Sequence, residues 1–150
     1  MIKPNEKHII ISAAVSAITL IVFIVLGVTD ILSINPNQLP STLLTTAGIF
    51  IGFTISALGI YYSIPLRDEI KIALIKQGYY KQVARNFIIS IVAFTIVTVI
   101  SIISICIYTD NEYVLVQHIL NSISIASFIF AILLLVLTSI NFFKIVIKNR

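Results

Sequence analysis

The residues best suited to chemistry are few and widely spaced in this 150-residue chain. It has two histidines, His8 and His118, and one cysteine, Cys106. A zinc site needs three or four closely placed His, Cys or carboxylate ligands, and one thiol cannot form a disulfide within a chain. We interpret both histidines and Cys106 as structural residues. The less favoured alternatives are a metal site at Asp110, Glu112 and His118 shared between subunits, and a bridge between subunits through Cys106.

Neither composition nor motifs indicate an enzyme. The sequence has no Gly-rich phosphate loop, no nucleophile elbow and no zinc motif, so we expect no catalytic residue, metal or cofactor. It is 59% hydrophobic and 11% charged, against about 45–50% and about 25% in soluble domains. So short a chain cannot bury that much apolar surface. We therefore predict a single integral membrane domain over residues 1–150.

Four segments are long and apolar enough to span a membrane, which takes about 20 residues. They cover residues 8–29, 43–63, 87–108 and 119–143, and none contains a charged residue. A continuous apolar run must be helical in lipid, and short connections make neighbouring helices antiparallel. The predicted fold is an all-α membrane protein, an up-down antiparallel bundle of four transmembrane helices. The first segment lacks a signal-peptide cleavage pattern, so we expect it to be retained.

Charge distribution predicts the orientation of these spans. All ten basic residues fall on one side of the predicted membrane, where they include Lys3, Lys7, Lys144, Lys148 and Arg150 at the ends of the chain. The positive-inside rule places that side, with both termini, in the cytoplasm. The formal net charge of +4 is thus attributed to topology and not to nucleic-acid binding. Because no span contains Asp, Glu, Lys or Arg, coupled transport is disfavoured.

The second span carries a stripe of small residues on one helical face. We call it the small-residue stripe, and its members are Thr45, Gly48, Gly52, Ser56, Gly59 and Ser63. Such residues let another helix approach closely in lipid. They are candidates for packing or oligomerisation, with two interpretations: contact with another helix of the same bundle, which we favour, or self-association. Weaker hydroxyl faces are marked on the other spans by Ser12, Ser16 and Thr19, by Thr95, Thr98 and Ser101, and by Ser124, Ser127 and Thr138. Their hydroxyls either bond their own helices, which we favour, or line a narrow pore.

The second and third spans are joined by a cytoplasmic elbow, residues 64–86. The sequence of the first part of the elbow predicts a short amphipathic helix. Pro65 lies near the start of this helix and Gly78 ends it. The basic residues of the elbow are candidates for contact with anionic lipid or a cytosolic partner: Arg67, Lys71, Lys76, Lys81 and Arg85. We favour a helix lying at the headgroup level, with a docking surface for a cytosolic effector protein as the alternative.

Four spans, cytoplasmic termini and the basic elbow with its Gly78-Tyr79-Tyr80-Lys81 turn resemble small four-span membrane subunits of bacterial anti-phage systems, the Kiwa-type membrane subunit among them. The resemblance is one of layout over the whole chain and transfers no functional residue. It implies an oligomeric sensor or anchor of the bacterial inner membrane that recruits or signals to a soluble effector.

Three functional hypotheses follow. The first, which we favour, is such an oligomeric anchor or sensor that acts through the basic elbow and contacts membrane lipids. The second is a pore-forming effector that permeabilises the membrane, and the third is a toxin-immunity or superinfection-exclusion protein. An enzyme or a coupled transporter is least favoured.

Overall fold

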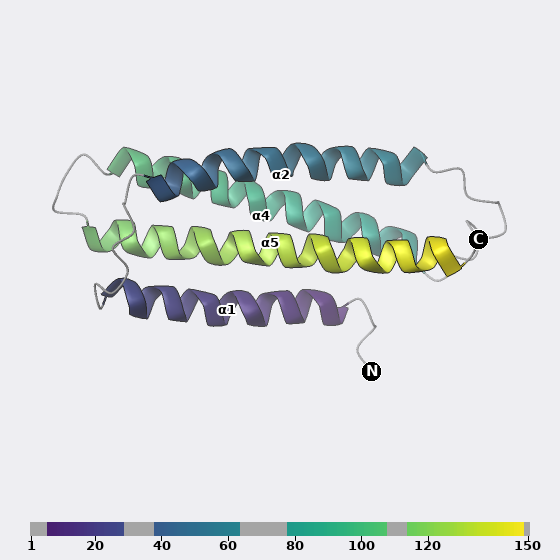
Figure 1. The fold of residues 1–150 in the computed structure, drawn as a ribbon, viewed down its shortest axis with the longest axis horizontal. Coiled ribbons are helices and arrows are strands. Elements are labelled where there is room, and N and C mark those ends of the chain that lie inside the picture. Colours follow the sequence, from purple (N-terminus) through teal and green to yellow (C-terminus); the bar gives the residue numbers. More distant parts are fainter. Residues whose placement is uncertain (1–5, 29–37, 64–77, 108–113, 149–150) are drawn as a thin grey trace.

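The computed structural model describes residues 6–28, 38–63, 78–107 and 114–148 (Figure 1). They form four helices: α1 (Glu6–Val28), α2 (Gln38–Ser63), α4 (Tyr79–Ile107) and α5 (Val114–Lys148). Every described residue except Gly78 is helical, so the prediction of an all-helical chain with four helices is confirmed. The amphipathic helix expected in the first part of the elbow, residues 64–77, lies outside the described residues.

Three of the helices are long and apolar enough to cross a membrane. The qualifying stretches are Gln38–Ser63, Lys81–Ile107 and Leu115–Ile140, and α1 contributes a shorter apolar stretch, Ile9–Val25. The helices extend beyond the predicted spans: α4 starts eight residues before Phe87, and α5 runs five residues past Phe143. The sequence has no Pro or Gly at either extension, so nothing stops the helix where the apolar run stops.

The beginning of α4 depends on the conformation of Gly78. Its φ of 68° is left-handed, a region that glycine adopts without steric cost. The amide of Gln82 donates to the Gly78 carbonyl at 3.3 Å, the first hydrogen bond of α4. Gly78 was expected to end the elbow helix, a prediction that falls on residues 64–77, outside the described residues. In the structure Gly78 immediately precedes α4. Residues 79–85 therefore form the first two turns of α4, continuous with the third span.

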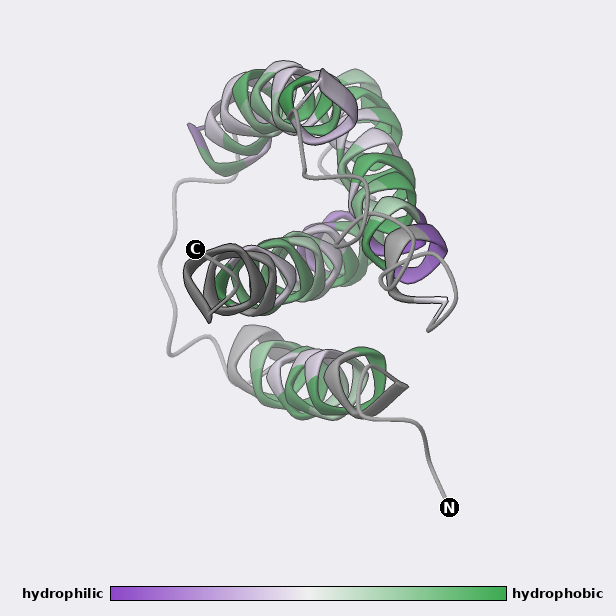
Figure 2. Cartoon of the chain, turned by 90° about the vertical axis from the view of Figure 1, so that its right-hand side faces the viewer, coloured by the Kyte–Doolittle hydropathy of each residue, from purple (hydrophilic) through white to green (hydrophobic). Residues whose placement is uncertain are grey.

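The helices pack in the spatial order α1, α5, α4, α2. Extensive contacts join α1 to α5, α5 to α4, and α4 to α2, with a smaller contact between α2 and α5. Successive helices run in opposite directions, and α5 lies between α1 and the α2–α4 pair (Figures 1 and 2). As a result α2, α4 and α5 form a three-helix unit, and α1 packs on the α5 side of it. α1 has no extensive contact with α2 or α4.

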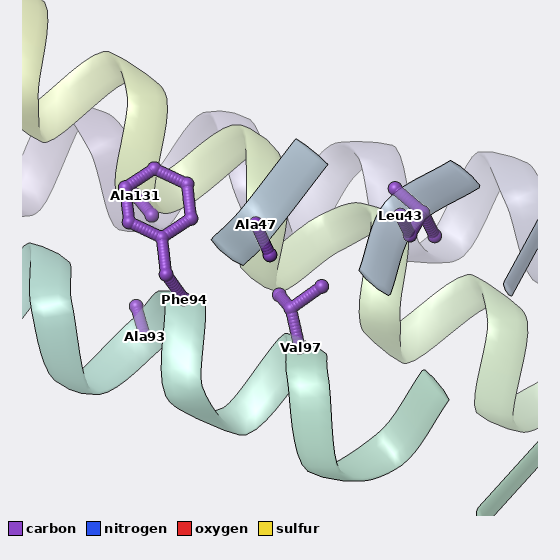
Figure 3. Close-up of a cluster of buried hydrophobic side chains, with 6 residues drawn as sticks. All are labelled: Leu43, Ala47, Ala93, Phe94, Val97 and Ala131. Carbon is purple, nitrogen blue, oxygen red and sulfur yellow. The ribbon is translucent and has the colours of Figure 1, made fainter. Parts of the chain in front are cut away.

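Small and aromatic side chains fill the centre of the three-helix unit. The larger buried cluster contains Leu43, Ala47, Ala93, Phe94, Val97 and Ala131 (Figure 3). Phe94 is completely buried, and its ring stacks on that of Phe50 with 5.3 Å between centroids. The Phe128 ring contacts both, at 5.7 Å from Phe94 and 5.9 Å from Phe50. The alanines bring the backbones close enough for these three rings to fill the space between helices.

The exterior of this fold is apolar, unlike that of a soluble protein, and polar residues are among those buried inside. Large aliphatic side chains are exposed along all four helices, and hydrophobic residues, green in Figure 2, occur along each of them. Eleven buried residues are polar: Ser12, Thr54, Asn86, Ser90, Ser101, Ser104, Gln117, Asn121, Ser122, Ser124 and Thr138. An apolar exterior of this extent in water would be an aggregation surface, whereas in lipid it is matched to its solvent. The structure thus supports a membrane protein.

Candidate interaction surfaces

The small-residue stripe lies entirely on the outside of the structure. All six of its residues are exposed. A Cβ atom added at Gly48, Gly52 or Gly59 would meet no atom within 4 Å. The interpretation that we favoured from sequence, in which the stripe packs against another helix of the same bundle, is therefore wrong for this structure. The small-residue stripe is available for contact with lipid or with another molecule.

The opposite face of α2 makes the contacts within the chain. Its buried residues include Pro40, Ala47, Thr54 and Tyr61, which recur every seven residues. Ala47 packs in the Phe94 cluster, and Tyr61 packs beside Phe87, with 6.4 Å between ring centroids. Residues seven apart lie on the same side of a helix, so these four residues define the side of α2 that packs against the other helices. The small-residue stripe lies on the opposite side.

The hydroxyl groups of the small-residue stripe are satisfied by their own helix. Thr45 donates to the Ser41 carbonyl at 3.0 Å, Ser56 to that of Gly52 at 2.9 Å, and Ser63 to that of Ile60 at 3.0 Å. The stripe therefore presents no unpaired donor to its surroundings. Close approach of backbones, and not side-chain hydrogen bonding, would drive association through such a surface.

The structure describes two of the five basic candidates of the elbow. Lys81 and Arg85 are both exposed in the first two turns of α4. They are four residues apart and so lie on the same face. Arg67, Lys71 and Lys76 lie outside the described residues. The chain between α2 and α4 starts and ends at the end of the structure that also holds the start of α1 and the end of α5 (Figure 1).

Several hydroxyls proposed as pore-lining groups bond to their own helix instead. Thr19, Thr95 and Thr98 donate to the carbonyls of Val15, Ile91 and Phe94 at 2.9, 2.9 and 3.0 Å. This is the interpretation favoured from sequence. Among the described residues, the buried positions of α4 between Ser90 and Ser101 are apolar. The buried cluster around Phe94 therefore lies between two sets of buried polar groups in the α4–α5 pair. One set includes Asn86 and Thr138, and the other includes Ser104 and Asn121.

Polar side chains also join different helices. Asn86 donates through Nδ2 to Oγ1 of Thr138 at 3.2 Å, and Ser104 donates to Oδ1 of Asn121 at 2.9 Å, linking α4 to α5 at two levels. Ser16 donates to the Ala126 carbonyl at 2.7 Å and links α1 to α5.

Sequence reasoning missed both asparagines and Gln117, which is also buried. In the structure, buried positions recur every seven residues, at Val83, Ser90, Val97 and Ser104 in α4 and at Gln117, Ser124, Ala131 and Thr138 in α5. Gln117 belongs to these repeats, whereas Asn86 and Asn121 do not. Such repeats mark helix-packing seams.

The residues first considered for chemistry are dispersed. His8 lies near the start of α1 and His118 near the start of α5, which are opposite ends of the structure (Figure 1). Cys106 is exposed close to the end of α4. Within the described part of the chain, no three His, Cys, Asp or Glu side chains are grouped as metal ligands. The two histidines therefore cannot share a ligand within one chain.

Comparison with protein-family models, curated proteins and solved structures finds no match to the chain.

Proposed function

We propose that this protein is an oligomeric anchor or sensor of the bacterial inner membrane, with four spans, cytoplasmic termini and a basic elbow that engages a cytosolic effector protein. The observation that carries the proposal is the exposure of the whole small-residue stripe on α2. A membrane-spanning surface of small residues favours close contact with another helix. None of the four described helices occupies it.

The other helices support assigning the small-residue stripe to association between chains. Ser12 of α1, Ser101 of α4 and Ser124 of α5 are small residues buried at helix contacts. Small residues therefore contribute to the contacts between helices of this chain. A second copy of the chain would give the six exposed small residues of α2 a contact of the same kind.

Charge supports the proposed orientation. The start of α1, the end of α2, the start of α4 and the end of α5 gather at one end of the structure (Figure 1). Every basic residue of the sequence belongs to these helix ends or to the chain segments attached to them. Asp30, Asp110 and Glu112 belong to segments attached at the other end. This asymmetry favours a cytoplasmic basic end.

The elbow is the best candidate for contact with a soluble protein. It contains five basic residues, and the two that are described, Lys81 and Arg85, are exposed. A cytosolic partner with an acidic surface would match this charge, although anionic headgroups would also attract it. The anti-phage layout noted above suggests a defence effector as that partner.

The oligomer is tested by adding bulk to the small-residue stripe. Gly52→Ile should leave the fold intact, because a Cβ there contacts nothing, and should abolish self-association. The matched control is Ala17→Ile, which adds bulk at an exposed position of α1. Native mass spectrometry from nanodiscs would count chains per particle, with circular dichroism to verify helix content. If Gly52→Ile and wild type form the same oligomer, the assignment of the stripe is wrong.

The partner is tested by charge reversal. Affinity purification from native membranes would compare wild type with a variant carrying Lys71→Glu, Lys76→Glu and Lys81→Glu. The control carries Lys144→Glu and Lys148→Glu, two basic residues near the end of α5. We expect a soluble protein to copurify with wild type and the control but not with the elbow variant. Equal recovery from all three would contradict a role for the elbow.

A further inference from the structure

The two hydrogen bonds between α4 and α5 fix how these antiparallel helices lie against each other. Ser104 meets Asn121 near one end, and Asn86 meets Thr138 near the other. Ser101 and Ser124 each lie three residues further into the membrane-spanning part of their helix than Ser104 and Asn121. Three residues are about one helical turn. The pairing therefore places these two serines at the same level of the α4–α5 contact.

Both serines are buried with unpaired hydroxyl groups. Each is 1% exposed, and neither Oγ atom has a hydrogen-bond partner in the described structure. Ser90 and Ser122 show that a buried serine here can use the backbone, since they donate to the carbonyls of Asn86 at 3.1 Å and His118 at 2.8 Å. The two unpaired hydroxyls lie at the same level, one helical turn from the hydrogen-bonded pair Ser104 and Asn121. This arrangement suits a small ligand that both hydroxyls would share.

The chemistry of the surrounding groups restricts that ligand to a small neutral one. The buried polar groups of this level and of the Ser104–Asn121 pair one turn away are three serine hydroxyls and one carboxamide, at Ser101, Ser104, Ser124 and Asn121. No carboxylate belongs to this set, so a bound cation would keep an uncompensated charge inside the fold. An apolar ligand would leave both hydroxyls unpaired. Water both donates and accepts, and buried water typically makes two to four hydrogen bonds to such groups.

We propose that water bound between Ser101 and Ser124 is a structural component of the α4–α5 contact. It joins the two hydroxyls and extends the polar layer formed by Ser104 and Asn121. Apolar residues next to this layer, among them Phe94 and Val97, are completely buried. They confine hydration to this layer, so the site ties two helices together and does not form part of a path across the membrane.

Solid-state NMR of the protein in liposomes tests the site directly, with water as the probe. In water-edited spectra, magnetisation from water should reach Ser101 and Ser124 several-fold faster than it reaches Ser90. Ser90 is the matched control because it is fully buried on the same helix and its hydroxyl is already bonded. Build-up at Ser101 and Ser124 as slow as at Ser90 would show a dry contact and overturn the proposal.

A double variant gives a second measurement. Ser101→Ala with Ser124→Ala removes both hydroxyls, and the water signal at Asn121 should then fall several-fold, whereas Ser90→Ala should leave it unchanged. An unchanged Asn121 signal in the double variant would contradict the site. Should the double variant not insert, the wild-type comparison with Ser90 decides alone. Neither readout depends on oligomer formation or on a partner, so this proposal stands or fails separately from the proposed function.

Discussion

At the scale of single residues, the same side chain has opposite roles at different positions. Phe94 is fully buried and contacts the rings of Phe50 and Phe128. Phe53 is 63% exposed on the outside of α2. In a soluble protein an exposed phenylalanine would be unusual, but towards lipid it is well solvated. Only Phe94 therefore contributes packing energy that is lost on truncation.

Replacing these two phenylalanines should separate the packed interior from the lipid-facing surface. We expect Phe94→Ala to lower the free energy of unfolding by about 3 kcal/mol, since it leaves a cavity beside the two remaining rings, those of Phe50 and Phe128. Phe53→Ala should change it by less than about 0.5 kcal/mol, as expected for a surface position. Equilibrium unfolding with sodium dodecyl sulfate in mixed micelles measures both. Equal losses would mean that the interior is not organised around Phe94.

Sequence alone predicted the types of residue that matter but not all of their environments. The spacing of Gly48, Gly52 and Gly59 correctly marked one face of α2. Whether that face meets a neighbour depends on where α4 lies, which spacing does not encode. Asn86 was assigned to the elbow because it precedes the apolar run, yet it is 1% exposed between helices. Hydropathy averages over both sides of a helix and so does not distinguish a polar residue at a contact from one in a loop.

At the scale of elements, the first helix differs from the other three in how it is held. Among the described helices, α1 has extensive contact only with α5, and Ser16 donates to the Ala126 carbonyl at 2.7 Å across this contact. Four helices and their approximate positions were predictable because long apolar runs in lipid have few alternatives. Their ends were not, since α4 and α5 continue through polar residues that are themselves good helix formers.

The contact between α1 and α5 should be detectable by crosslinking. In a Cys106→Ser background, Ser16→Cys with Ala126→Cys should be joined by a short bifunctional thiol reagent. Val15→Cys with Ala126→Cys is the control, because Val15 is exposed whereas Ser16 is half-buried and bonded to Ala126. A protease site inserted between residues 64 and 77 reports the result, since only a crosslinked chain stays together after cleavage. More crosslinking through position 15 than through position 16 would show that α1 is wrongly placed.

At the scale of the whole molecule, charge and helix direction agree. Alternating helix directions bring four helix ends to one end of the structure (Figure 1), and all ten Lys and Arg residues belong to that end or to the segments attached to it. Neither the order of the helices nor their packing was needed to predict this asymmetry. It came from the positions of charges along the chain, and the arrangement of the helices is consistent with it.

Single cysteines labelled from one side of the membrane test this orientation. In the Cys106→Ser background, Asp110→Cys should react with a membrane-impermeant maleimide in intact spheroplasts. Lys81→Cys should react only after the membrane is opened, because we place the basic end in the cytoplasm. Labelling of Lys81→Cys in intact spheroplasts would reverse the orientation, and labelling of both positions there would indicate mixed topologies.

The central position of α5 has a consequence for how the protein is made. Ser16 and Ala126 are 110 residues apart in the chain. At a synthesis rate of about 5–20 residues per second, α1 emerges from the ribosome roughly 6–20 s before its only extensive partner. During that interval the serine face of α1 meets only lipid, the insertion machinery or another nascent helix. Biogenesis of this protein therefore depends on keeping an early helix unassembled until the last one arrives.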